Sequence, residues 1–176
     1  ITAHVGGVTF SDDRKETTKG YVGYIEEKAR IDNVTLSLGG RFEYMKMHYR
    51  DKAATMGTTS NLEEDIYAFA PGGGILYDHN DNLQFFFGAY KGFNVPSPGS
   101  ARDDGTPVEK ETSLAKEVGF RYTDSNFLLT LTGFHTDFEN LIVINNSNSD
   151  SVPDNAGNVI TKGLEFQTRY KPENVL

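Results

Sequence analysis

Residues 34–44 read Val-Thr-Leu-Ser-Leu-Gly-Gly-Arg-Phe-Glu-Tyr, and this stretch decides the fold class. Its residues alternate between an apolar set and a set of small or charged side chains. The apolar set is Leu36, Leu38, Phe42 and Tyr44, and the other set is Ser37, Gly39, Arg41 and Glu43. Successive side chains of a β-strand point to opposite faces, so the alternation predicts a strand with one apolar and one polar face.

The same alternation recurs along the chain, whereas helical periodicity fits nowhere for long. Strands are expected at residues 17–31, 34–49, 66–78, 83–92, 114–123, 127–144 and 158–170. In the sixth of these, Phe127 and Phe134 have opposite parity. A bulge near Gly133 would reconcile them, and the outward face of this strand stays open.

Short and long connections alternate between these strands. Short polar turns fall at residues 32–33, 79–82, 123–126 and 171–174, and longer polar loops at 50–65, 93–113 and 145–157. An up-and-down barrel of the bacterial outer membrane has short periplasmic turns and long extracellular loops. The asymmetry therefore favours an all-β, antiparallel, up-and-down transmembrane β-barrel. The alternative is a soluble β-sandwich, such as a carbohydrate-binding or adhesion module, whose apolar faces form its core.

Composition excludes several classes of protein. The chain has 176 residues, a net charge of −8 and no cysteine. Nucleic-acid-binding modules usually carry a basic face, so the acidic balance argues against nucleic acid. Disulfide frameworks and thiolate zinc sites are excluded by the lack of cysteine. The mean hydropathy of −0.49 still permits a membrane barrel, because each spanning strand needs only about 10 alternating residues.

Enzymatic chemistry finds no support, so no catalytic residue, metal site or cofactor is expected. The histidines, at positions 4, 48, 79 and 135, lack zinc-binding spacing. No nucleophile elbow, P-loop or Rossmann fingerprint occurs, and Gly72-Gly73-Gly74 lies inside an expected strand. Two acidic clusters, 11–14 and 103–105, could bind calcium weakly, but solvated outer loops are the favoured interpretation.

Five stretches resemble the barrel of TonB-dependent outer-membrane receptors, in the order of that family. They are residues 16–44 with their Gly-x-Arg-aromatic-Glu ending, 85–98 with Gly-Phe-x-x-Pro, 111–122 with Glu-Thr-Ser and Glu-x-Gly-x-Arg, 133–142 with Thr-Asp-Phe-x-Asn-Leu-Ile, and 155–166 with Asn-Ala-Gly and Lys-Gly-Leu-Glu. Residues 85–113 look closest to receptors for ferric citrate and related ferric siderophores. A porin-like outer-membrane channel is the runner-up.

The resemblance implies a receptor that binds a ferric chelate and imports it when the TonB complex remodels a plug domain. It also implies location in the outer membrane, among its lipid and lipopolysaccharide. Such barrels have about 22 strands, and a whole one would need roughly 550 residues. Residues 1–176 are therefore expected to be a partial barrel of about seven strands, without the plug domain and without the C-terminal strand.

Six charged residues are expected to face the barrel lumen: Arg41, Glu43, Glu117, Arg121, Glu165 and Arg169. A wall network of paired ions is the favoured role. The other role is contact with the ligand, because arginine suits the carboxylates of a citrate-like chelate. Ligand-gating residues are expected instead in the loops 50–65 and 93–113.

Overall fold

The computed structural model describes residues 14–51, 60–102, 106–145 and 152–172. The strands are β1 (Arg14–Ile31), β2 (Val34–Asp51), β3 (Ser60–Asp78), β4 (Leu83–Asn94), β5 (Glu111–Thr123), β6 (Phe127–Glu139), β7 (Ile142–Asn145), β8 (Val152–Asn155) and β9 (Val159–Tyr170). Across these ranges no helix is long and apolar enough to cross a membrane.

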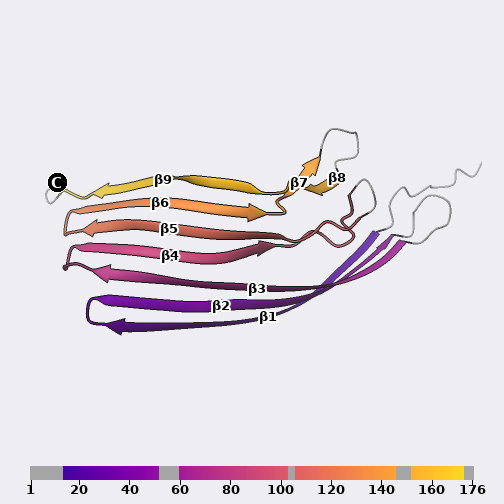
Figure 1. Cartoon of the computed structure of the whole chain (residues 1–176), viewed down its shortest axis with the longest axis horizontal. Coiled ribbons are helices and arrows are strands. Elements are labelled where there is room, and N and C mark those ends of the chain that lie inside the picture. Colours follow the sequence, from indigo (N-terminus) through magenta and orange to yellow (C-terminus); the bar gives the residue numbers. More distant parts are fainter. Residues whose placement is uncertain (1–13, 52–59, 103–105, 146–151, 173–176) are drawn as a thin grey trace, which may run out of the picture.

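Seven strands form one antiparallel sheet in the order β1-β2-β3-β4-β5-β6-β9. The two remaining strands, β7 and β8, pair with each other in a hairpin inserted between β6 and β9. Figure 1 shows the seven strands side by side, with the short turns at the left and the long connections at the right. The all-β, up-and-down order expected from the sequence is confirmed.

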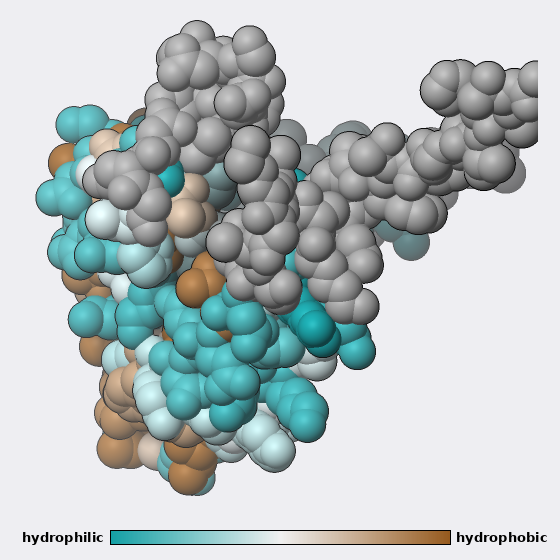
Figure 2. All heavy atoms as spheres, turned by 90° about the vertical axis from the view of Figure 1, so that its right-hand side faces the viewer, coloured by the Kyte–Doolittle hydropathy of each residue, from teal (hydrophilic) through white to brown (hydrophobic). Residues whose placement is uncertain are grey.

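The pairing register gives the sheet two chemically different faces. The apolar face carries facing aromatic pairs such as Phe42 with Phe69. None of the described residues covers it, since Leu38 is 71% and Leu164 is 78% exposed. The opposite face, called the polar face, carries arginine and glutamate, although Tyr24 also lies there. In Figure 2 hydrophobic side chains gather along one margin and hydrophilic ones across the middle. An uncovered apolar surface of this extent indicates contact with lipid or with another protein.

Two bands of aromatic side chains border the apolar face. Near the long connections, Tyr44 stacks on Tyr21 and Tyr67, with ring centroids 6.1 and 4.8 Å apart. Near the short turns, Tyr77 stacks on Phe85 at 6.5 Å. Tyr67 and Tyr77 are ten residues apart on β3, which is about 33 Å of strand. A tilt of about 40° reduces this to a height of about 25 Å, the height of the apolar band of a transmembrane barrel.

Side chains of the short turns fix the backbone of these turns. Asn80 and Asp124 each accept hydrogen bonds from the backbone N–H groups two and three residues later, at 2.8 to 2.9 Å. Asp32 takes a left-handed conformation, with φ of 50°. The two backbone donors, together with the Tyr122 hydroxyl 3.0 Å away, hold the pKa of the Asp124 carboxyl below its ordinary value.

Strand β3 separates from β4 at Pro71. The β2–β3 ladder covers all of β3, whereas the β3–β4 ladder begins only at Gly72. Asp78 donates its N–H to Asn33, on the β2 side, and backbone groups alternate in direction along a strand. Odd-numbered residues of β3 therefore direct their backbone groups toward β4, where Pro71 has no N–H to donate. The glycine run 72–74 lies inside β3, as expected.

The expected strand 127–144 is wrong at its C-terminal end. Strand β6 ends at Glu139, because Asn140 adopts a left-handed backbone with φ of 54°. Residues 142–145 leave the sheet and pair with β8, which lies inside the expected loop 145–157.

The expected bulge at Gly133 is also wrong. Gly133 pairs directly with Val118 and Leu164, without an extra residue on either side. Phe127 lies on the apolar face and Phe134 on the polar face. The Phe134 ring covers Gly163, where an added Cβ would lie 2.9 Å from the ring. The missing side chain of Gly163 therefore makes room for an aromatic ring on the polar face.

The other expected loops are shorter than predicted. Strand β2 continues to Asp51 and β3 begins at Ser60, so half of the expected loop 50–65 is strand. Strand β4 continues to Asn94 and β5 begins at Glu111. Polar residues extend these strands because, beyond the aromatic band, neither face has to be apolar.

Candidate functional site

The polar face of β4, β5, β6 and β9 presents three rows of facing residues. Counted from the short turns, the rows are Gln84, Arg121, Thr130 and Gln167; Phe86, Gly119, Thr132 and Glu165; and Gly88, Glu117, Phe134 and Gly163. Facing residues of an antiparallel pair have Cβ atoms about 5 Å apart. The rows therefore form a wall in which hydrogen-bonding and charged groups alternate with aromatic rings laid over glycines.

All six charged residues singled out from the sequence lie on the polar face, in pairs on three different strands. These are Arg41 and Glu43 on β2, Glu117 and Arg121 on β5, and Glu165 and Arg169 on β9. Arg41 forms an ion pair with Glu43. Within the part of the chain that the structure describes, no ion pair joins the other four. The register thus places the six on one face without joining them in one cluster.

Ion pairs of the polar face concentrate on β1 to β3. Glu43 is only 7% exposed, so its carboxylate needs the Arg41 guanidinium as a partner. Lys28 pairs with Glu26 at 2.8 Å, and Arg30 pairs with Asp78 at 2.9 Å. Of the six residues predicted to form a wall network, only Arg41 and Glu43 pair with each other among the described residues, so the network stays a prediction.

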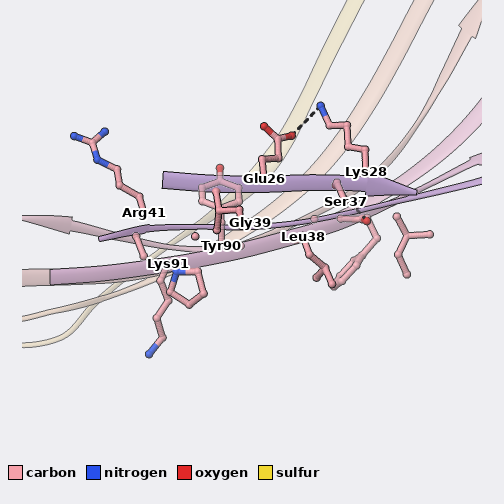
Figure 3. Close-up of a pocket in the computed structure, with 18 of the residues that line it drawn as sticks. Glu26, Lys28, Ser37, Leu38, Gly39, Arg41, Tyr90 and Lys91 are labelled. Carbon is pink, nitrogen blue, oxygen red and sulfur yellow. Dashed lines mark hydrogen bonds and ion pairs between the residues drawn. The ribbon is translucent and has the colours of Figure 1, made fainter. Parts of the chain in front are cut away.

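A hollow of about 710 Å³ crosses this charged region. Its floor on the polar face consists of small residues that face one another in the register: Ser37, Gly39, Gly72, Gly74 and Gly88. Figure 3 shows Glu26, Lys28 and Arg41 on one side of the strands, and Leu38 and Lys91 on the other. The floor is flat and the rim is charged, so a polar group from outside the sheet can approach the backbone closely.

The connection between β4 and β5 folds back over the polar face near the long-connection end. Met45, Met47 and Ile66 form a buried cluster there, against which Phe93 and Val95 pack. Val108, later in the same connection, is 1% exposed. Gly99, with φ of 74°, lies so close to the Tyr49 ring that an added Cβ would overlap it. The connection is thus anchored by apolar contacts, and it covers the polar face rather than extending outward.

A hydrogen-bonded clamp joins this connection to the β7–β8 hairpin. Arg102 donates to Thr106 at 3.1 Å, to Asp154 at 3.2 Å and to the side-chain oxygen of Asn155 at 2.6 Å. That oxygen also accepts the N–H of Glu109 at 2.9 Å, and the Asn155 amide donates to the Glu109 carbonyl at 3.1 Å. Arg102 and Asn155 were not singled out as site residues from the sequence. The signal that could have found them is the Asn-Ala-Gly motif at 155–157.

Metal binding finds no support in the residues with assigned positions, where no group of three or more His, Asp and Glu side chains could hold an ion. The two acidic clusters, 11–14 and 103–105, are interpreted as solvated outer loops, with weak calcium binding as the alternative; residues 11–13 and 103–105 lie outside the described residues. His48 bonds to Asn61 at 2.7 Å, and His135 lies 3.4 Å from Asp137. Each of these two histidines contacts a single polar side chain.

Comparisons with known proteins agree with this architecture. Residues 2–174 match the family model described as TonB dependent receptor-like, beta-barrel. The unliganded ferric citrate transporter FecA superposes with a TM-score of 0.72 at 26% identity, over 90% of this chain and 23% of FecA. The ferric yersiniabactin uptake receptor FyuA from Yersinia pestis gives 0.72 at 17% identity, over 89% of this chain and 25% of FyuA.

The copper transporter OprC gives a TM-score of 0.70 at 14% identity, over 89% of this chain and 27% of OprC. At their low identities, FyuA and OprC show the fold alone. The chain spans about a quarter of the length of these structures. The family match covers nearly the whole sequence and agrees with the one-sided loops and two-faced sheet, so the chain belongs to the TonB-dependent receptor-like β-barrel family.

Proposed function

We propose that this chain forms part of the barrel wall of an outer-membrane receptor that imports a ferric chelate, with energy delivered through TonB. The observation that carries the proposal is a seven-stranded sheet with an uncovered apolar face on one side and, on the other, a polar face covered by a folded-in connection. The 176 residues then correspond to one part of the barrel wall, since they span about a quarter of the length of the similar receptors. It serves as wall and lid and catalyses no reaction.

The apolar face supports location in the membrane. Its two aromatic bands are about 25 Å apart in height, as in outer-membrane barrels. The short turns would then lie in the periplasm and the long connections outside the cell. The alcaligin outer-membrane receptor FauA from Bordetella pertussis has a similar fold, with a TM-score of 0.64 at 18% identity over 88% of this chain and 27% of FauA.

The polar face supports passage of a polar ligand. Arg121 and Arg169 lie there without an ion-pair partner among the described residues. A guanidinium binds carboxylates through two parallel hydrogen bonds, so both residues suit an anionic, carboxylate-bearing chelate. FecA, the similar structure with 26% identity, is a ferric citrate transporter. Ferric citrate is therefore the first ligand to test.

The test is uptake of radioactive iron by cells that lack their own ferric citrate receptor and express the complete chain containing this segment. Ferric citrate, a ferric catecholate and copper are supplied in parallel, in strains with and without TonB. We expect TonB-dependent uptake of ferric citrate. The double variant R121Q/R169Q should lower this uptake, while K171Q, at the short-turn end, serves as the matched control.

Two results would overturn the proposal. Iron uptake that persists without TonB would indicate a porin-like channel. A complete chain that folds as a soluble monomer without detergent would indicate a soluble β-sandwich module. Preference for the catecholate would retain the proposal and replace only the chelate, whereas preference for copper would overturn the import of a ferric chelate.

A further inference from the structure

We infer that the apolar face carries a binding site for a phosphorylated lipid, formed by Lys116, His135 and Lys162 above a hollow at Gly133. This inference rests on the proposed function, because it needs the apolar face to meet lipid. The three basic residues face one another directly across β5, β6 and β9. The neighbouring row on the short-turn side is apolar and consists of Phe87, Val118, Gly133 and Leu164.

The basic row has more positive charge than its protein partners neutralise. Asp137 lies 3.3 Å from the Lys116 ammonium and 3.4 Å from the His135 ring. Lys162 has no hydrogen bond or ion pair to any residue that the structure describes. Lys116 and Lys162 flank His135 in one row, so two ammonium groups share the single nearby carboxylate of Asp137. An anion from outside the protein would balance the remaining positive charge.

An apolar hollow of about 460 Å³ lies beside the basic row, on its short-turn side. Its floor is Gly133, where an added Cβ would touch only Leu164 at 3.4 Å and the Val118 carbonyl at 3.8 Å. Val118 and Leu164, which line the hollow, are 59% and 78% exposed. Phe87 closes a further side. The apolar side chains that line the hollow suit an acyl chain lying along the sheet.

The order of the two parts matches the order in an amphiphile. Lys162 is eight residues from Tyr170 on β9, which is about 20 Å of height for a strand tilted by about 40°. The outer edge of the apolar band lies at about 25 Å, within reach of a lysine stem. The ammonium groups therefore reach the outer head groups, while the hollow at Gly133 lies deeper. This places a phosphate above and an acyl chain below.

The occupant is a lipid rather than a free anion, because Lys116 and Lys162 line the same hollow as the apolar side chains of Val118 and Leu164, and these four side chains lie on the apolar face. The protein contributes two ammonium groups for a phosphate. Each lysine near an anionic membrane surface contributes about 1 kcal/mol, so losing two corresponds to about 30-fold in retention. The tighter of the two predicted contacts is with Lys162, which has no competing carboxylate.

Native mass spectrometry of the complete receptor chain tests the inference. The purified protein is mixed with bis-phosphorylated lipid A, with neutral phosphatidylcholine, or with inorganic phosphate. We expect selective retention of lipid A and an approximately 30-fold loss in K116Q/K162Q. The control K46Q, on the apolar face of β2, should retain lipid A. G133L, which fills the hollow but keeps the charges, should also lower retention.

Equal retention of lipid A by wild type and K116Q/K162Q would overturn the inference, as would equal retention of phosphatidylcholine. Binding of inorganic phosphate with the same affinity as lipid A would indicate an anion site without a lipid. Unchanged retention in G133L would remove the acyl-chain site. Measuring uptake of ferric citrate by the same variants separates the two proposals, because transport without lipid retention refutes this inference alone.

Discussion

Replacing Asn155 with alanine should release the β7–β8 hairpin from the connection between β4 and β5. The Asn155 side chain makes four hydrogen bonds. Its oxygen accepts from Arg102 at 2.6 Å and from the Glu109 N–H at 2.9 Å. Its amide donates to the carbonyls of Glu109 at 3.1 Å and Asn140 at 2.7 Å. No other side chain in this clamp reaches both segments and the end of β6.

The magnitude follows from these four bonds. Each intramolecular hydrogen bond contributes about 1 kcal/mol net when buried. Water replaces part of that contribution here, because two of the four bonds are exposed and the other two are only partly buried. A loss of about 2 kcal/mol remains, and 1.4 kcal/mol corresponds to tenfold in an equilibrium constant. Local opening of the clamp should therefore increase about 30-fold in N155A.

Hydrogen exchange of the complete receptor, followed by mass spectrometry, measures this opening. Peptides covering residues 106–111 and 152–157 should exchange faster in N155A, while a peptide covering the β1–β2 turn stays unchanged. N155D keeps both acceptor contacts and loses both donor contacts, so it should show a smaller increase of about fivefold. Exchange in N155A within twofold of wild type would refute the clamp.

Three further predictions concern the sheet and its turns. L164R places a charge near the middle of the apolar band and should lower folding stability in lipid vesicles by about 2 to 4 kcal/mol. E165R, on the polar face, should lower it much less. Urea titrations measure both, and equal losses would contradict the assignment of faces. G119V should lower folding stability by about 1 to 3 kcal/mol or prevent assembly, because its Cβ would overlap a carbonyl of β6 and an aromatic ring of β4. The control is G23A, whose added Cβ would meet nothing within 4 Å. Band-shift electrophoresis compares the folded fractions of the two variants. Hydrogen bonding lowers the pKa of Asp124 from its ordinary value of 3.8, so its stabilising contribution is present above that value and is lost as pH falls through the folded pKa. D124A should therefore show a smaller decrease in melting temperature between neutral and acidic pH, and an unchanged decrease would contradict the prediction.

Alternation and turn chemistry made the main sheet predictable from the sequence. Strand β5 and strand β9 differ from the predicted ranges by only a few residues at their ends. The turns were readable because Asn80 and Asp124 carry the acceptor that the turn requires. These signals are local, so one sequence suffices to find them.

Strand β6 shows where local signals stop being sufficient. The apolar residues 142–144 continue the β-pattern, so the sequence predicted one long strand. The left-handed backbone of Asn140 ends β6, and pairing with Pro153 and its neighbours then forms a separate hairpin. Phe134 led to the wrong prediction of a bulge, because an aromatic residue was not expected on the polar face. Its ring lies there against Gly163 on β9. Both errors depend on contacts that are distant in the sequence.

The inward fold of the β4–β5 connection also depends on contacts distant in the sequence, so it was not predicted. The pattern of residues along β2 nevertheless indicates it. Before Tyr44, the β2 side chains on the apolar face include Leu38 and Phe42. After Tyr44, the same face carries Lys46, whereas Met45 and Met47 lie on the polar face. The polarity of the two faces therefore inverts at the tyrosine band. Outside the band the outer face meets water, and the inner face packs against the connection. Contact with water explains the polar outer face, and packing against the connection explains the apolar inner face. Because neither contact alone changes both faces, an inversion within one strand indicates both the edge of the apolar band and a loop that turns inward.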